Sequence, residues 1–215
     1  MDFDWIISDT HFGHDGILKY EPGRVDRMRK DRHRNHATWL VTRWNAVVRP
    51  DDHVLHLGDF AFKDEAERVL RRLNGRITLL LGNHDKPEKM RELAASSGGK
   101  LKVVEGIDGQ PCDNPHVSAL TANLADRKVF FCHYPLLTAE PHVRGRIAEA
   151  HAIMQEAFID GGFEVCVHGH LHSKDEQIDP RHEINVSFER IGFAPLAWDI
   201  LGEWVKAPHL RTRKT

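Results

Sequence analysis

The chain has 215 residues, of which 40% are hydrophobic and 29% charged, a balance typical of one globular domain with a buried core. No apolar run approaches the roughly 20 residues of a membrane span, which excludes an integral membrane protein. The formal net charge of −2 disfavours a wholly basic nucleic-acid binder, and three cysteines cannot form a complete disulfide framework. We therefore expect a cytoplasmic protein with no membrane partner.

Short β-rich runs alternate with segments of helical period, which predicts an α/β fold. Strands are expected at residues 5–8, 54–57, 77–81, 101–104, 128–132 and 165–167, with a last candidate at 184–187. The run at 77–81 is almost wholly apolar, so we expect it to be buried on both faces. Apolar stripes of helical spacing predict amphipathic helices over residues 37–48, 66–73 and 147–158.

The pattern contains no internal repeat, low-complexity tract or linker, and it predicts a single domain over residues 1–205. The last ten residues, 206–215, are basic and polar. We expect them to form a flexible tail.

Five short clusters of polar residues fall at or just past the carboxyl end of an expected strand. They are Asp9-Thr10-His11, Gly58-Asp59, Gly82-Asn83-His84-Asp85, His133 and Gly169-His170-Leu171-His172. Ligands gather at strand ends in open α/β sheets. Most of the clusters are weak signals alone, but a Gly-Asn-His-Asp run is expected only roughly 0.003 times by chance in this composition. Their joint occurrence in this order is the strong signal.

The side chains collected in this way are three Asp or Asn oxygens and four imidazoles: Asp9, Asp59, Asn83, His11, His133, His170 and His172. Mixed nitrogen and oxygen donors without a thiolate suit Mn²⁺, Fe²⁺ or Zn²⁺. Seven donors are too many for one catalytic ion that keeps an open position, but they are enough for two ions that share a carboxylate. Such a pair can stabilise a phosphoryl group and generate hydroxide near neutral pH.

The five clusters together resemble the signature of the calcineurin-like metallophosphoesterase superfamily, between residues 9 and 172. The opening run Ser8-Asp9-Thr10-His11-Phe12-Gly13-His14 is further similar to a branch of small bacterial and phage phosphoesterases. The resemblance implies a four-layer α/β/β/α sandwich with two mixed β-sheets. It also implies a metal-dependent phosphohydrolase with a dinuclear centre and a bridging hydroxide.

The resemblance also implies roles for individual residues. The first metal is assigned to Asp9, His11, Asp59 and His172. The second metal is assigned to Asp59, which bridges, with Asn83, His133 and His170. The cofactors are then two divalent ions, with Mn²⁺ expected and Fe, Zn, Ni or Co as alternatives. His84 is the implied catalytic residue, which stabilises the transition state or protonates the leaving oxygen.

One departure from the family bears on the substrate. Protein Ser/Thr phosphatases continue the Gly-Asp motif into an Asp-Arg-Gly, whereas this chain reads Gly58-Asp59-Phe60-Ala61-Phe62-Lys63. The phosphate-binding arginine of those enzymes is missing here, which disfavours a protein phosphatase and favours a phosphodiesterase acting on a small phosphoester. The alternatives are a phosphomonoesterase acting on nucleotides or small phosphorylated metabolites, a nuclease, which the near-neutral charge disfavours, and a non-catalytic scaffold, which the intact motifs disfavour.

Three further side chains are candidates for substrate contact: His14, Arg24 and Arg144. Arg24 belongs to the basic stretch from Lys19 to Arg34, which is either a solvated face or helix entry, or the border of the metal cleft. Arg144 either returns to the site or opens a helix. Asp85 either orients His84 or caps the helix expected near residue 87. The sequence leaves the oligomeric state open.

Overall fold

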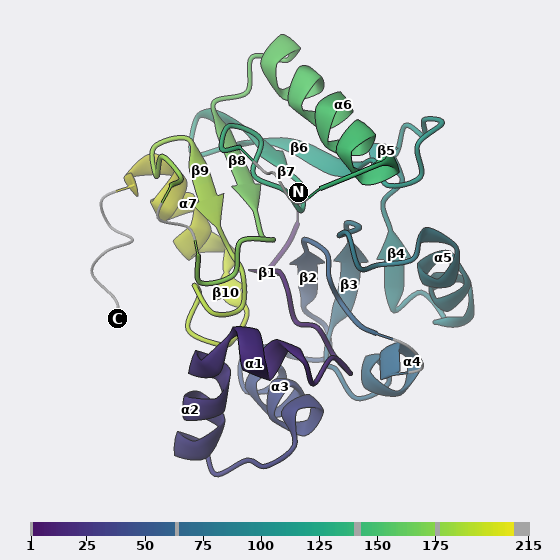
Figure 1. The fold of residues 1–215 in the computed structure, drawn as a ribbon, viewed down its shortest axis with the longest axis vertical. Coiled ribbons are helices and arrows are strands. Elements are labelled where there is room, and N and C mark those ends of the chain that lie inside the picture. Colours follow the sequence, from purple (N-terminus) through teal and green to yellow (C-terminus); the bar gives the residue numbers. More distant parts are fainter. Residues whose placement is uncertain (1, 63–64, 140–142, 175–176, 209–215) are drawn as a thin grey trace.

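Two five-stranded β-sheets form the centre of the protein in the computed structural model, which describes residues 2–62, 65–139, 143–174 and 177–208 (Figure 1). The first sheet has the order β10-β1-β2-β3-β4, and only β10 is antiparallel to its neighbour. Its strands are β1 (Trp5–Ile7), β2 (His53–His56), β3 (Arg76–Leu79), β4 (Leu101–Val103) and β10 (Leu196–Ala197).

The second sheet has the order β5-β6-β7-β8-β9, and its one antiparallel pair is β6 with β7. Its strands are β5 (Gly106–Ile107), β6 (Ser118–Leu124), β7 (Arg127–Phe131), β8 (Val165–His168) and β9 (Glu183–Asn185). Both sheets are therefore mixed.

Seven helices lie among the described residues: α1 (Ile17–Tyr20), α2 (Pro22–Lys30), α3 (His36–Asn45), α4 (Glu65–Leu70), α5 (Pro87–Ser96), α6 (Arg146–Asp160) and α7 (Trp198–Lys206). In Figure 1, α6 lies at one end of the view and α1, α2 and α3 lie at the other, with the two sheets between them. None of the helices in the described part of the chain is both long and apolar enough to cross a membrane.

Successive side chains of a strand point to opposite faces of its sheet, and the core is accordingly divided into three hydrophobic clusters. In β1, Ile7 packs with the apolar faces of α3, α4 and α5, whereas Ile6 packs in the cluster between the two sheets. In β7, Phe131 belongs to the cluster between the sheets and Phe130 packs with Phe158 of α6. Because each sheet is covered on both faces, the layers run α/β/β/α, and the predicted fold class is confirmed.

The sequence did not reveal every element. The strand β6 was missed because its side chains do not alternate cleanly between buried and exposed. It pairs with β7 through a two-residue turn of Ala125 and Asp126, both with φ above zero, where an Asn-Gly signal would have been expected. The short elements β5, β10 and α1 carry too few residues for a periodic signal. Lys206, the first residue of the predicted tail, ends α7, and residues 209–215 lie outside the described part.

Strand register brings the polar clusters to one edge of each sheet. Ile7 pairs with His56 and His56 pairs with Leu79, so the chain leaves β1, β2 and β3 at the same level. In the second sheet, Phe131 pairs with Val167, so the chain leaves β7 and β8 side by side. The five clusters therefore follow strand ends that lie next to one another.

Candidate metal centre

Backbone hydrogen bonds join the loops that carry the polar clusters. The N–H of Asp9 donates to the carbonyl of Gly58 at 3.0 Å, and the N–H of His11 donates to the carbonyl of Asp59 at 2.9 Å. In the second sheet, the N–H of Gly169 donates to the carbonyl of His133 at 3.0 Å. These bonds hold the loops in fixed positions relative to one another, which suits a preorganised site.

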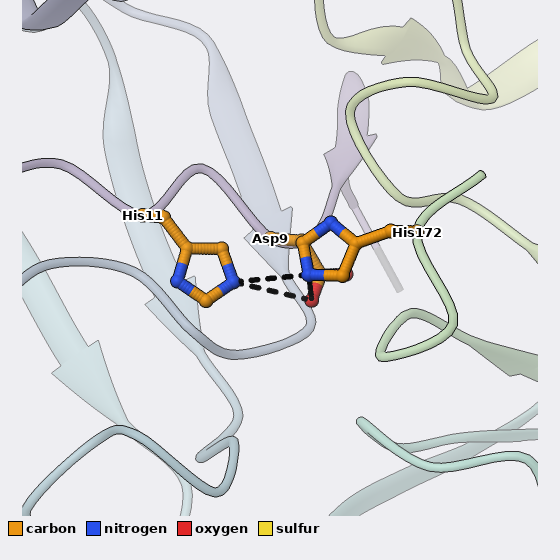
Figure 2. A group of neighbouring side chains, drawn as sticks. All are labelled: Asp9, His11 and His172. Carbon is orange, nitrogen blue, oxygen red and sulfur yellow. Dashed lines mark hydrogen bonds and ion pairs between the residues drawn. The ribbon is translucent and has the colours of Figure 1, made fainter. Parts of the chain in front are cut away.

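One group of donors surrounds a point between the loops after β1, β2 and β8. The Nε2 atoms of His11 and His172 lie 3.2 Å apart, and Asp9 Oδ1 lies 3.8 Å from the first and 3.6 Å from the second (Figure 2). Asp59 Oδ2 lies 3.4 Å from His11 Nε2. We call Asp9, His11, Asp59 and His172 the first donor group.

A second donor group lies on the other side of Asp59. Asn83 Oδ1 lies 3.0 Å from both His133 Nε2 and His170 Nδ1, and these two nitrogens are 3.2 Å apart. Asp59 Oδ2, the atom that faces the first group, lies 3.5 Å from His133 Nε2. The structure thus brings together all seven side chains that the sequence singled out.

The spacing of the donor atoms fits a metal ion. Four ligands placed tetrahedrally at 2.0–2.2 Å from a metal are about 3.3–3.6 Å apart, close to the separations in both groups. Within the described residues, Asp9 Oδ1 is buried and has no hydrogen-bond partner. The Nδ1–H of His133 donates to the carbonyl of Leu57 at 2.8 Å, so its Nε2 lone pair faces the donor group. The residues therefore fit divalent cations.

The electrostatics of the site also favour bound cations. Burial and the neighbouring Asp9 raise the pKa of Asp59 to about 7. Burial lowers the pKa of His172, but Asp9 and Glu189 outweigh it and raise that pKa to about 9. Carboxylates buried side by side are costly unless positive charge offsets them. A divalent ion held by Asp9 and Asp59 would supply that charge.

Several of the donors sit on strained backbone. Asp9, His11, Asp59, His170 and His172 all have φ between 51° and 66°, and they make up half of the ten described non-glycine residues with positive φ. Such conformations cost about 1–3 kcal/mol each and cluster at functional sites. A Cβ at Gly169 would collide with Ser8 Oγ and Asp9 Oδ2, so the loop after β8 can approach Asp9 only with glycine there.

A cavity of about 760 Å³ opens over the donor groups. His14 and His84 line it together with four of the donors, His11, Asn83, His170 and His172. The His84 backbone N–H donates to Asp59 Oδ1 at 2.9 Å, while its ring lies beside those of His11 and Phe62. The His14 ring stacks on Phe62 at 4.5 Å between centroids. Both histidines therefore stand at the cavity wall beside the donors.

The expected role of Arg24 in substrate contact is wrong. The side chain is fully buried, and its guanidinium donates to Glu189 and to the carbonyls of Asp9 and Thr10. A substrate contact needs an accessible guanidinium, so Arg24 acts beneath the site.

The rest of the basic stretch fits a solvated helix face. Arg27 pairs with Asp31 at 3.2 Å and Arg29 with Asp26 at 3.5 Å along α2. Arg144 is exposed just before α6 and is not among the described residues that line the cavity.

The interpretation of Asp85 as a helix cap is also wrong. The N-cap of α5 is Lys86, whose side chain makes no capping bond. The carboxylate of Asp85 is buried and accepts from the backbone N–H groups of Asp59 at 2.7 Å, Gly82 at 3.0 Å and Phe60 at 3.1 Å. Asp85 therefore holds the loops that carry Asp59 and Asn83, and nothing in its sequence position indicates those contacts.

Lys174 is a site residue that the sequence motifs did not indicate. Among the described residues lining the cavity, Lys174 is the one Lys or Arg side chain, and it is exposed. Its place two residues after His172 is a signal that could have identified it.

Comparison with known proteins gives a consistent result. A family model described as the calcineurin-like phosphoesterase superfamily domain matches residues 5–186. The uncharacterized protein MJ1445 of Methanocaldococcus jannaschii is 31% identical over 211 residues, which cover 92% of this chain and 88% of that protein. The gene 66 protein of Mycobacterium phage L5 is 26% identical over 183 residues, covering 80% and 79%.

A solved structure shares the fold. The protein of unknown function AQ665 from Aquifex aeolicus superposes with a TM-score of 0.62 at 23% identity, covering 93% of this chain and 97% of that one. At this identity the likeness concerns the fold alone.

Proposed function

Because the chain belongs to the calcineurin-like phosphoesterase superfamily and is thus a metal-dependent phosphoesterase, we propose that it hydrolyses phosphodiesters with two divalent ions, Mn²⁺ in the first instance. One observation carries the proposal. Asp59 Oδ2 lies 3.4 Å from His11 Nε2 and 3.5 Å from His133 Nε2, so a single carboxylate oxygen faces both donor groups. That arrangement suits a bridging ligand between two ions.

When bound, the two ions would supply Lewis-acid stabilisation of phosphoryl charge and activate water near neutral pH. The chain's own contribution comes from His84, whose side chain is exposed to the cavity. The surrounding protein and the nearby His170 lower the pKa of His84, so its imidazole is neutral at neutral pH. A neutral imidazole donates one N–H hydrogen bond, which would stabilise a phosphoryl or leaving-group oxygen in the transition state.

The charge of the cavity supports a diester substrate. A phosphodiester carries one negative charge and a monoester up to two. Among the described residues that line the cavity, Lys174 supplies the one permanent positive charge. We propose that Lys174 attracts the substrate and that His14 contacts one of its oxygens.

The test is hydrolysis of bis-p-nitrophenyl phosphate and p-nitrophenyl phosphate by metal-stripped protein titrated with Mn²⁺. We expect turnover that requires Mn²⁺ and a larger kcat/KM for the diester. Faster monoester turnover would overturn the diester assignment, and the absence of Mn²⁺-dependent turnover of either ester would overturn the proposal.

His84→Ala separates catalysis from metal binding. We expect kcat to fall by about 10²–10⁴-fold while the metal content stays unchanged, because the imidazole acts on the reacting group and is not a ligand. Metal analysis of the variant checks this, and loss of an ion would show that His84 has been given the wrong role.

A further inference from the structure

Three polar side chains alternate along the segment that begins at the last residue of β9. They are Asn185, Ser187 and Glu189, with the buried Val186 and Phe188 between them. The segment runs beside the end of β1, where the Ser8 N–H donates to the carbonyl of Val186 and the Phe188 N–H donates to that of Ser8, both at 3.1 Å. In extended chain, every second side chain points to the same face. Asn185 and Ser187 therefore face the loops that carry the first donor group, and Glu189, in the turn at residues 188–190, reaches the same loops through its contact with His172.

Two of these residues hold parts of that donor group. The Asn185 side-chain amide donates to the carbonyl of His172 at 2.9 Å. The Ser187 hydroxyl lies 2.9 Å from Asp9 Oδ2, which also accepts from the backbone N–H of His170 at 3.0 Å. Since Oδ2 is engaged in this way, the other oxygen of Asp9, Oδ1, is left to face His11 and His172.

Glu189 contacts the imidazole of His172 directly. Its Oε2 lies 3.2 Å from His172 Nδ1, and the Glu189 side chain is 4% exposed. A carboxylate can only accept, so Nδ1 carries a hydrogen, and Nε2 is the ring nitrogen left to bind a metal ion. Nε2 is the atom that faces Asp9 Oδ1 and His11 Nε2.

Arg24 fixes the other oxygen of Glu189. Its Nε donates to Glu189 Oε1 at 2.5 Å, and its two terminal nitrogens donate to the carbonyls of Thr10 at 3.0 Å and Asp9 at 2.6 Å. The guanidinium also lies over the Phe188 ring, 5.0 Å from its centroid. The buried pair thus connects His172 with the main chain that carries Asp9 and His11.

We propose that Glu189 is a positioning residue for the first metal ion: anchored by Arg24, it holds His172 in the tautomer that presents Nε2 to the metal. The inference rests on the proposed dinuclear centre. Glu189 lies beyond the part of the chain that the family model matches, which ends at residue 186. Partners that orient a metal-bound imidazole typically change metal affinity by about 10–100-fold when they are removed.

Glu189→Gln is the informative variant because it keeps the size of the side chain. Arg24 is permanently charged, so the amide oxygen turns toward it and the amide NH₂ faces His172. The imidazole then places its hydrogen on Nε2, where the metal should bind. We expect metal-stripped wild-type protein to bind two Mn²⁺ per chain in calorimetry. In E189Q we expect one site to weaken by about 10–100-fold and the other to stay unchanged.

Glu164→Gln is the matched control, because Glu164 is exposed and pairs with Arg127 instead of a residue of the donor groups. It should keep both affinities. If E189Q also keeps both affinities, the positioning role is refuted while the proposed function stands. If the wild type binds fewer than two ions, the dinuclear proposal fails and the role of Glu189 fails with it.

A measurement on the wild type covers the case in which E189Q does not fold. In protein labelled with ¹⁵N-histidine and loaded with Zn²⁺, we expect the His172 signal to show a protonated Nδ1 and a metal-bound Nε2. The signal is identified by its loss in His172→Gln. A hydrogen on Nε2 would overturn the proposal whatever the variants do.

Discussion

His56 allows a quantitative prediction of how stability depends on pH. The ring is fully buried, and its Nδ1 accepts from the backbone N–H of Gly58 at 3.2 Å. Its Nε2–H must then donate to Thr10 Oγ1 at 3.0 Å, and the Thr10 hydroxyl donates to the carbonyl of Phe60 at 2.8 Å. This chain of hydrogen bonds, which joins the loops carrying Asp9 and Asp59, is satisfied only by the neutral imidazole.

Burial accordingly lowers the pKa of His56 from 6.5 to about 3. Because the folded value lies below the unfolded one, the unfolded state takes up the proton first. The contribution to stability is fully present above pH 6.5 and is lost as the pH falls toward 3. Between pH 7 and pH 5, the loss from this one group is about 2 kcal/mol.

Urea unfolding of metal-stripped protein at pH 7 and pH 5 measures this loss. Other titrating groups also change the unfolding free energy of the wild type between pH 7 and pH 5. The contribution of His56 is therefore the difference between the wild type and His56→Gln. The drop in unfolding free energy from pH 7 to pH 5 should be about 2 kcal/mol smaller in His56→Gln. Thr10→Val is the control: it breaks the same hydrogen-bond chain but keeps the buried imidazole, so it should be less stable at both pH values and retain the steep drop. Equal drops in wild type and His56→Gln would refute the reasoning.

Three other substitutions test the site. Asp59→Asn removes charge from the oxygen shared by both donor groups, so both Mn²⁺ affinities should fall in calorimetry; a loss confined to one ion would argue against bridging. Asp85→Ala leaves three buried backbone N–H groups without their acceptor, at about 1–3 kcal/mol each. Its unfolding free energy should drop by at least about 3 kcal/mol, and a drop below about 1 kcal/mol would contradict the assigned contacts. Gly169→Ala should displace Asp9, so the affinity of the first donor group for Mn²⁺ should fall more than that of the second group. Unchanged affinity at both sites would refute the clash expected between a Cβ at residue 169 and Asp9.

Secondary-structure elements were predictable from the sequence where packing in the core requires a regular spacing of hydrophobic residues. The apolar stripes of α3 and α6 and the buried runs of β3, β7 and β8 all carry hydrophobic residues at the spacing of their structure. The missed α2 shows the opposite case. Its sequence indicates only a charged stretch, because Met28 and the fully buried Arg24 are its only buried residues. Arginine is normally found at the surface, so Arg24 does not contribute to a predicted apolar face.

The donor residues were predictable for a different reason: strand ends converge, so short polar clusters after strands can be assigned to one place. The residues that hold the donors were not predictable. Asp85, Ser187 and Glu189 act through contacts with loops that are distant in sequence. In the sequence alone, each of them looks like an ordinary polar residue on the protein surface. Their roles depend on burial, which no local pattern records.

Backbone strain explains why these hidden contacts are needed. Five donors with positive φ cost together about 5–15 kcal/mol, as much as the whole stability of a typical domain. Isolated loops would not adopt that conformation, so hydrogen bonds between loops must offset the cost in the folded chain. The contacts of Asp85 with the loops after β2 and β3, and of Arg24 with the loop after β1, supply such bonds from buried charged groups. The donor geometry is therefore a property of the whole fold, although each donor could be identified from a few consecutive residues.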